Sequence, residues 1–251
     1  MKVLMCDQGS PEWLDARCGV STASELNSIF TPKRCELSAG WKKYAAQLIS
    51  EILIGGPDPW RFEGATVDMR RGNEYEPENR DFIAFTYGVD IQQVGFCLHD
   101  DGKRGASPDG LMGEMGLELK CPAPKTQINW VYDDVLPDEH KNQCHGGMIV
   151  TGYDSWLFSS YCAGCPSLIK EVKRDDYTRM LEEAWLKFLE RFDKMFAVIQ
   201  EKRLATIDAK IAMKGSDQLD DSHRSLVPPS GQWGNGDLDH FAPGEYEPQL
   251  F

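Results

Sequence analysis

The stretch that most constrains this chain is a short run of alternating apolar and charged residues, Leu117-Glu118-Leu119-Lys120. Alternation with a period of two predicts a β-strand with one buried side, so the two leucines should point into the core. Glu118 and Lys120 then share the opposite face. Two unlike charges are therefore predicted to lie side by side over one site on a sheet.

A glycine-containing turn is predicted to fold a second strand back onto this one. Residues 106–111 are separated from the charged strand by residues 112–116, whose two glycines suit a tight antiparallel reversal. A hairpin centred on that turn would place Asp109 opposite Glu118. Neighbouring carboxylates repel unless a divalent cation lies between them, and oxygen ligands suit magnesium or manganese. The pattern predicts a metal site beside Lys120, although an ordinary surface hairpin also fits it.

The two acids and the lysine form the pattern D-x(n)-E-x-K of the PD-(D/E)xK nuclease superfamily. The longer string S-P-D-G-L…G-L-E-L-K-C-P, within residues 107–122, resembles in particular the lambda exonuclease, or YqaJ-type viral recombinase, family. The resemblance implies an α/β (α+β) fold with a central mixed β-sheet flanked by helices, like the core of restriction endonucleases, and a C-terminal helical segment.

The resemblance also implies an activity. Family members are processive 5′-to-3′ double-strand DNA exonucleases that use Mg²⁺, with Mn²⁺ as a substitute, and leave 3′ single-stranded overhangs for recombination by strand annealing. The implied partners are double-stranded DNA ends, a single-strand annealing protein and further copies of the chain in a trimeric ring. Two alternatives stay open: an endonuclease of the same superfamily, and a non-catalytic module that binds DNA ends or a partner.

Individual residues acquire roles from the same resemblance. Lys120 would orient or deprotonate the attacking water, or stabilise charge on the phosphate. Glu76 ends a G-x-x-x-E motif at residues 72–76 and would add a further acid, although a glutamate paired with Arg80 one turn on is the alternative. The implied catalytic residues are Lys120, Glu118, Asp109, Glu76 and Gln143. The implied metal ligands are Asp109, Glu118, Glu76 and the backbone carbonyl of Leu119.

A second motif precedes the first. Residues 13–25 read W-x-x-x-R-x-G-x-x-T-A-S-E, and residues 22–25 fit a capping box at the start of a short helix. A helix start with Arg17, Thr22 and Ser24 nearby could hold a phosphate, whereas a plain capped helix with a surface arginine is the alternative. The motif is similar to the N-terminal motif of the same family, which implies that these three side chains bind the 5′ phosphate of DNA.

Further segments follow from periodicity and turn residues. Helices are predicted at residues 38–53, 69–87 and 139–150, with one long amphipathic helix or two in series at 175–213, and strands at 91–98, from 104 onward, at 156–161 and at 167–172. Asp138 is expected to cap the helix at 139–150. Gln143 and His145 stand where the family commonly carries Q-x-Q, so His145 could contact DNA, with a structural histidine as the alternative.

Composition limits the state of the cysteines, the location of the protein and the extent of any basic surface. Eight cysteines lack a framework spacing and no export signal or long apolar run is present, so we expect reduced thiols and a cytoplasmic protein without a membrane segment. Cys162-Ala163-Gly164-Cys165 could be a zinc half-site, a redox pair or a tight turn. The net charge of −13 argues against a surface that binds nucleic acid everywhere but permits a local basic channel. Residues 1–213 are predicted to form the exonuclease domain and residues 214–251 a flexible acidic tail.

Overall fold

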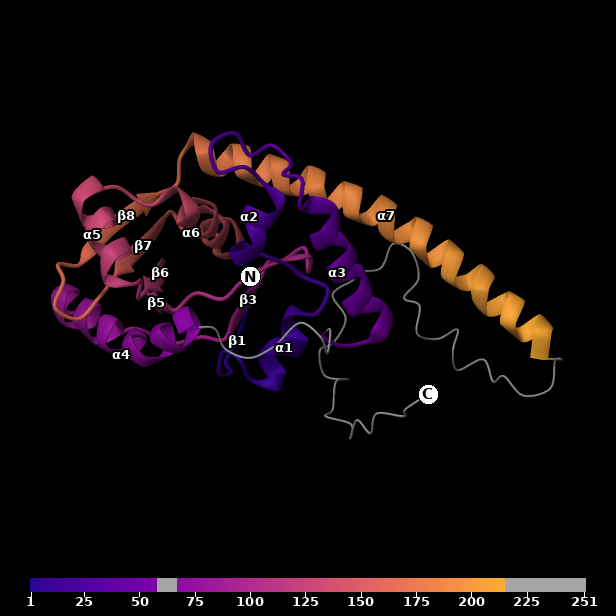
Figure 1. Cartoon of the computed structure of the whole chain (residues 1–251), viewed down its shortest axis with the longest axis horizontal. Helices are drawn as coiled ribbons and strands as arrows, with labels where there is room; N and C mark the ends of the chain where they lie inside the picture. The colour runs from indigo at the N-terminus through magenta and orange to yellow at the C-terminus, as the bar shows by residue number, and fades with distance from the viewer. Residues whose placement is uncertain (58–66, 215–251) are drawn as a thin grey trace. The chain divides into compact units, whose positions relative to one another are not determined.

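The computed structural model describes residues 1–57 and 67–214 (Figure 1). The chain divides into a compact unit, Met1–Arg203, and a second unit that begins at Leu204. The predicted acidic tail lies outside the described residues from residue 215 onward, and the predicted boundary at residue 213 stays a prediction. Within the two described ranges, no helix is both long enough and apolar enough to cross a membrane.

Two four-stranded mixed sheets organise the compact unit. The first has the order β1-β3-β4-β2, in which β3 pairs antiparallel with β1 and β4, and β2 pairs parallel with β4. Its strands are β1 (Lys2–Leu4), β2 (Ser21–Thr22), β3 (Phe96–Leu98) and β4 (Arg104–Ala106). The predicted hairpin around residues 99–102 is confirmed. The strand predicted at residues 91–98 is shorter than expected, because only an isolated bridge between Gln92 and Leu111 precedes β3.

The second sheet has the order β5-β6-β7-β8. A parallel pair, β6 and β7, lies at its centre, and each edge strand pairs antiparallel with its neighbour. Its strands are β5 (Gly110–Met112), β6 (Met115–Lys120), β7 (Ser155–Ser160) and β8 (Leu168–Lys173). The mixed sheet predicted from the motif and the two strands predicted after residue 155 are confirmed.

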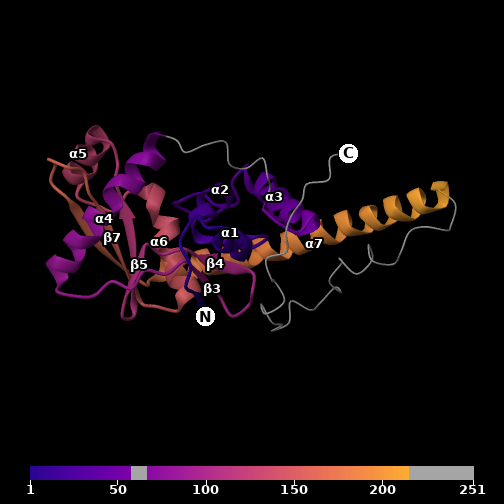
Figure 2. The same cartoon turned by 90° about the horizontal axis from the view of Figure 1, so that it is seen from below.

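Helices cover both faces of this second sheet, as Figures 1 and 2 show. Leu117 and Leu119 are buried with Ile83 of α4 (Val67–Tyr87) on one face. Met148 of α6 (Asp138–Thr151) packs against Trp156 on the other face. Because side chains alternate along a strand, Glu118 and Lys120 emerge on the α6 side. The leucines are therefore buried as predicted, and the charged pair lies on a face that a helix partly covers.

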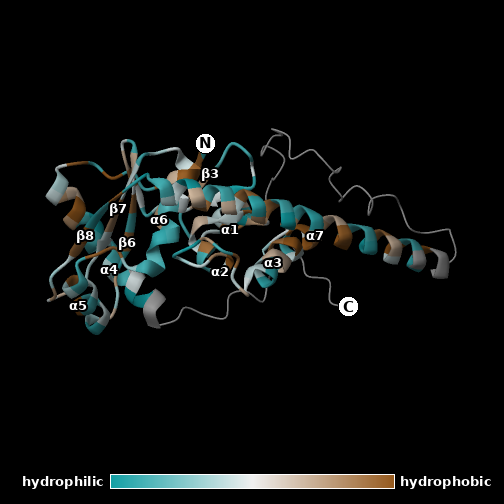
Figure 3. Ribbon diagram, turned by 90° about the horizontal axis from the view of Figure 1, so that it is seen from above, coloured by the Kyte–Doolittle hydropathy of each residue, from teal (hydrophilic) through white to brown (hydrophobic). Residues whose placement is uncertain are grey.

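The remaining helices include those that build the largest buried cluster. In chain order, the remaining helices are α1 (Pro11–Arg17), the 3₁₀ turn η1 (Ala23–Glu25), α2 (Leu26–Ile29), α3 (Trp41–Ile54), α5 (Pro124–Asp133) and α7 (Asp176–Lys214). The largest buried cluster takes residues from α2, α3 and α7. The predicted long helix is one helix, and Figure 3 shows teal and brown alternating along it, as expected for an amphipathic helix. Its Trp185 and Phe188 are fully buried, and Trp185 Nε1 donates to Ser21 Oγ at 2.8 Å.

Two predicted helix caps are wrong. Thr22 has extended backbone geometry at the end of β2 and makes no side-chain capping bond, because its hydroxyl instead lies beside Arg17. Asp138 is the first residue of α6, and Pro137 occupies the cap position without a side-chain acceptor. An acid in the first turn still favours the helix through its dipole. Both helices therefore form near their predicted places, and other interactions fix where they begin.

Candidate active site

The β5–β6 hairpin brings Asp109 to β6, the strand that carries Glu118 and Lys120. Gly110 pairs with Leu117, and the turn reverses at Gly113, whose φ of +61° suits glycine. The amide of Asp109 donates to Leu117 O at 3.0 Å, and Asp109 Oδ2 accepts from the amide of Leu119 at 2.6 Å. Asp109 therefore lies one step beyond the Gly110–Leu117 pair, opposite Glu118, as the sequence predicts.

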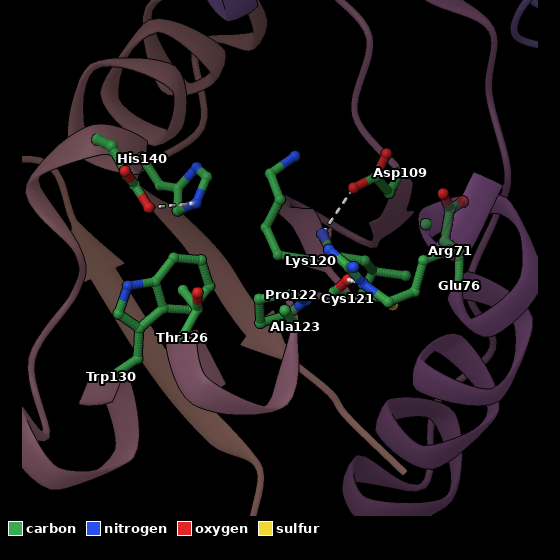
Figure 4. Close-up of a pocket in the computed structure, with 13 residues that line it drawn as sticks. Arg71, Glu76, Asp109, Lys120, Cys121, Pro122, Ala123, Thr126, Trp130 and His140 are labelled. Atoms are coloured by element: carbon green, nitrogen blue, oxygen red, sulfur yellow. Dashed lines mark hydrogen bonds and ion pairs between the residues drawn. The ribbon is translucent and has the colours of Figure 1, made fainter. Parts of the chain in front are cut away.

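A cavity of about 510 Å³ opens beside this hairpin (Figure 4). Asp109 and Glu76 lie on one side of it, and Trp130 and His140 lie on the other, with the Lys120 side chain between them (Figure 4). The lining residues are Arg71, Gly72, Glu76, Asp109, Leu119, Lys120, Cys121, Pro122, Ala123, Thr126, Trp130, Glu139 and His140. A second cavity of about 530 Å³ also reaches Glu76 and Asp109, from the side of residues 5–8. The structure thus gathers most of the predicted catalytic residues at one accessible place.

The carboxylates of this site are electrostatically strained. Burial raises the pKa of Glu118 to about 8, with Lys120 lowering it and Asp109 raising it. Burial also raises the pKa of Asp109 above its usual range. The pKa of Glu76 is raised by burial and by the charge of Asp109, against the opposing effect of Arg80. Three acids that resist ionisation together form a site that favours a bound cation.

Lys120 partly compensates this charge. Burial alone would lower the pKa of Lys120, but the charges of Glu118 and Asp109 raise it above its ordinary value. Its Nζ forms an ion pair with Glu118 Oε1. Glu118 is only 1% exposed, so the Lys120 ammonium is the partner that offsets its buried charge.

The donor set fits a hard divalent cation. Asp109 and Glu118 offer carboxylate oxygens, the donors that magnesium and manganese prefer, and Leu119 lines the same cavity. Among residues 1–57 and 67–214, no three acidic, cysteine or histidine side chains are already arranged as a metal site. Lys120 Nζ contacts Oε1 of Glu118, an oxygen that a bound cation would also use.

Glu76 has the partner that the alternative interpretation named. It forms an i,i+4 ion pair with Arg80 within α4, and its side chain is one-third exposed. It also lines the cavity of about 510 Å³ beside the β5–β6 hairpin, together with Asp109. The two interpretations are therefore compatible in space, since one oxygen can face Arg80 while the carboxylate borders the site.

A cluster of hydroxyls surrounds Arg17. Arg17 Nη1 donates to Ser107 Oγ at 2.9 Å, and Nη2 lies 3.4 Å from both Thr22 Oγ1 and Ser24 Oγ. The guanidinium also lies over the ring of Trp13, 4.2 Å from its centroid. The three predicted phosphate-binding residues are thus brought together. We call these five residues, Trp13, Arg17, Thr22, Ser24 and Ser107, the Arg17 cluster.

Ser107 was not assigned a role from the sequence. It accepts from Arg17 and from Trp13 Nε1, both at 2.9 Å, and stands two residues before Asp109. The signal that could have found it is its place in the same S-P-D-G string as Asp109. Ser107 connects the Arg17 cluster to the β5–β6 hairpin through the main chain.

Two α6 residues from the prediction do not line the cavity. Gln143 is half-buried, and its role stays a prediction. His145 is 2% exposed, its Nδ1 lies 2.8 Å from Thr178 Oγ1, and its ring lies 4.8 Å from that of Tyr177. These contacts match the structural alternative for His145, so its predicted contact with DNA has no support from its position. Five residues before His145, His140 lines the cavity and was missed by the sequence analysis.

The C-x-x-C segment forms a tight turn between β7 and β8. The amide of Cys165 donates to Cys162 O at 2.9 Å, and Gly164 has a φ of +77°. Both thiols are free, as are those of the other six cysteines. The segment therefore has the geometry of the tight-turn alternative.

Comparisons with known proteins agree with this fold and site. The YqaJ-like viral recombinase domain model matches residues 12–154. The alkaline exonuclease LHK-Exo from Laribacter hongkongensis, solved by itself and in complex with dAMP, is similar over 78% of this chain and 100% of its own, with 28% sequence identity and a TM-score of 0.69.

A phage-related exonuclease from Haemophilus somnus 129PT, at 14% identity and a TM-score of 0.51, covers 72% of this chain and 96% of its own, and shows the likeness of fold alone. Among curated proteins, none matches the sequence. The matched range contains both motifs, so the predicted family resemblance is confirmed.

Proposed function

Because the chain belongs to the YqaJ-like viral recombinase family, we propose that it is a magnesium-dependent exonuclease that degrades double-stranded DNA from a free end. It removes nucleotides in the 5′-to-3′ direction and leaves 3′ single-stranded overhangs. The overhangs would pass to a single-strand annealing protein, and the chain would act as a ring-shaped homo-oligomer. The similarity to LHK-Exo, an alkaline exonuclease by name, supports the nuclease assignment.

One observation carries the proposal: a cationic cluster and an anionic site are joined by a three-residue segment. Ser107 belongs to the Arg17 cluster and Asp109 to the carboxylate site. Two residues of extended chain span at most about 7 Å. A terminal phosphate held at Arg17 would therefore leave the carboxylates within reach of a phosphodiester only a few nucleotides along the same strand. This arrangement favours cleavage near a 5′ end over cleavage at internal sites.

The chain's own residues divide the chemistry between them. Asp109, Glu118 and the carbonyl of Leu119, with Glu76 at the border, would hold the cation. When bound, a divalent cation polarises the scissile phosphate and lowers the pKa of a coordinated water. Lys120, as a charged ammonium, would orient the attacking water or stabilise charge that develops on the phosphate; it could deprotonate that water only once a bound cation offsets the charges of Glu118 and Asp109, which raise its pKa. Lys120 must first release Glu118, since the two are paired.

The Arg17 cluster would recognise the strand end. Its guanidinium is held over Trp13 and hydrogen-bonded to Ser107, so it is oriented before DNA arrives. Arginine suits this role because its planar fork can donate two hydrogen bonds to one phosphate. The hydroxyls of Thr22 and Ser24 add donors beside it.

The test is digestion of a linear duplex labelled on its 5′-ended or 3′-ended strand, with magnesium or with EDTA, beside a closed circle of the same sequence. Loss of the 5′-ended strand from the linear DNA alone, only with magnesium, is the expected result. Cutting of the closed circle would instead establish an endonuclease, and binding without cleavage would establish a DNA-end-binding module.

A further inference from the structure

His140 lines the cavity beside the β5–β6 hairpin, on the wall opposite the carboxylates. It comes from the first turns of α6 and lies across the cavity from Asp109 and Glu76 (Figure 4). Its side chain is 14% exposed, and its imidazole borders the same space as Lys120. A phosphodiester placed between the carboxylates and Lys120 would therefore face His140 from the opposite wall.

Aromatic packing holds the His140 ring in place. The ring stacks on Phe158 of β7, with centroids 5.2 Å apart and planes 27° apart. The ring of Trp130 meets it edge-on at 5.2 Å and 90°. One aromatic neighbour stacked on the imidazole and one that meets it edge-on leave the imidazole little freedom to rotate. The direction of its nitrogens is thus set by the fold before any ligand binds.

One nitrogen of this fixed ring has no hydrogen bond. His140 Nε2 is buried and makes no hydrogen bond, since Oε1 of Glu139, joined to it by a dashed line in Figure 4, lies 3.7 Å away, beyond hydrogen-bond distance. Buried polar atoms are nearly always satisfied, so an unsatisfied one in a cavity indicates a missing ligand atom. The ligand that this cavity would hold, a phosphodiester, is rich in acceptor oxygens. A neutral imidazole N–H is a suitable donor to such an oxygen.

We propose that His140 is a substrate-contacting residue whose Nε2–H donates to a non-bridging oxygen of the phosphodiester seated beside Lys120. The proposal rests on the nuclease function proposed above and adds a donor on the wall opposite the carboxylates. The imidazole aligns the phosphate against Lys120, and Phe158 and Trp130 act as positioning residues for it. Because the donor is preoriented, its hydrogen bond becomes stronger as negative charge accumulates on the phosphate oxygens.

Two variants of the full-length protein separate the nitrogen from the ring. His140→Phe keeps an aromatic ring against Phe158 and Trp130 but removes the donor, whereas His140→Gln can place an amide N–H near the position of Nε2. We expect digestion of a linear duplex at saturating DNA to slow by about 10- to 100-fold in His140→Phe, the typical effect of losing one hydrogen bond to a charged group. His140→Gln should recover most of that loss. Thermal unfolding of each variant, measured alongside, shows whether the fold is retained.

The outcomes separate this proposal from the nuclease function. A wild-type protein that digests no DNA contradicts the nuclease function itself. If the wild type digests DNA and the two variants digest it at equal rates, the role of Nε2 is contradicted and the nuclease function stays intact. This holds whether both rates equal that of the wild type or both are equally slow at an unchanged unfolding temperature.

A measurement on the unaltered protein decides the question if His140→Phe does not fold. In ¹⁵N-histidine NMR spectra, the His140 signals are identified as those missing from the His140→Gln spectrum. Adding a 5′-phosphorylated duplex with calcium in place of magnesium should shift the Nε2 signal of His140 and protect its proton from exchange. An Nε2 signal that stays unchanged at saturating duplex would overturn the proposal.

Discussion

The carboxylate site and the Arg17 cluster are opposite in charge and in how well their polar groups are satisfied. At the carboxylate site, burial raises the pKa of both Asp109 and Glu118, and the charge of Asp109 raises that of Glu118 further. In the Arg17 cluster, the guanidinium is hydrogen-bonded to Ser107 and lies over Trp13. The first site concentrates buried negative charge, and the second presents an oriented guanidinium. Under the proposed function, the second site would hold the terminal phosphate of a DNA strand while the first would place a cation at the next phosphates of that strand.

The largest effect is expected at the carboxylate site. Asp109→Asn should lower DNA digestion by about 10³-fold or more, because it removes a charge that the cation and the reacting phosphate both need. Its unfolding temperature should not fall, since the substitution relieves repulsion with Glu118. Digestion rate and thermal unfolding check both parts. Asp100→Asn, at an exposed acid outside the cavity, is the matched control and should keep the wild-type rate.

The second-largest effect tests whether the Arg17 cluster binds a 5′ phosphate. Arg17→Ala should slow digestion of 5′-phosphorylated ends by about 10- to 100-fold, which corresponds to the loss of one or two charge-assisted hydrogen bonds. Unphosphorylated ends should be affected much less, because they lack the group that Arg17 would bind. Rates on both kinds of end are compared in the same assay.

Arg34→Ala removes an exposed arginine outside the cluster and should slow neither substrate. Equal slowing of both kinds of end by Arg17→Ala would remove the phosphate pocket from the proposed function.

His145 is expected to affect the pH dependence of the free energy of unfolding and not the rate of DNA digestion. Burial lowers the pKa of His145 to about 4, from an unfolded value near 6.5. Between these values the unfolded state binds more protons, so the free energy of unfolding should fall as the pH drops from 6.5 toward 4, with no contribution above that window. At pH 5 the loss amounts to about 2 kcal/mol.

Urea unfolding at pH 5 and pH 7.5 checks this contribution. The decrease between the two pH values should be smaller in His145→Gln than in the wild type. An identical decrease in both proteins would show that His145 is not the group responsible, and slower DNA digestion by a stable His145→Gln protein would revive its predicted contact with DNA.

The smallest effect concerns metal binding itself. Magnesium at ten times its dissociation constant should stabilise the fold by about 1.4 kcal/mol, because it binds the folded site and not the unfolded chain. For a domain of this size, the unfolding temperature rises by about 3 to 6 °C. Glu118→Gln should lose this shift.

Glu171→Gln, at an exposed acid on β8, should retain the magnesium-dependent shift and serves as the control. If the unfolding temperature of the wild type does not change at any magnesium concentration, the proposed metal site is contradicted.

The sequence alone determined the features that depend on neighbours along the chain. The alternation at residues 117–120 identified β6 and its buried leucines, and the turn after β5 fixed Asp109 opposite Glu118, because hairpin register follows from loop length. The helical period at residues 175–213 predicted one long helix or two in series, and α7 is one helix. The motif strings also indicated the family, which the comparison confirms.

Only the tertiary structure decided which distant segments meet. Ser107 joins Arg17 across 90 residues, and His140 faces Lys120 because α6 crosses the sheet at that point. The predicted capping box failed for the same reason, since Thr22 turned its hydroxyl toward Arg17 instead of the helix. Local periodicity fixes the direction of a side chain within its own element. The partner it meets depends on how the helices and sheets pack, and that choice is made by burial over the whole core.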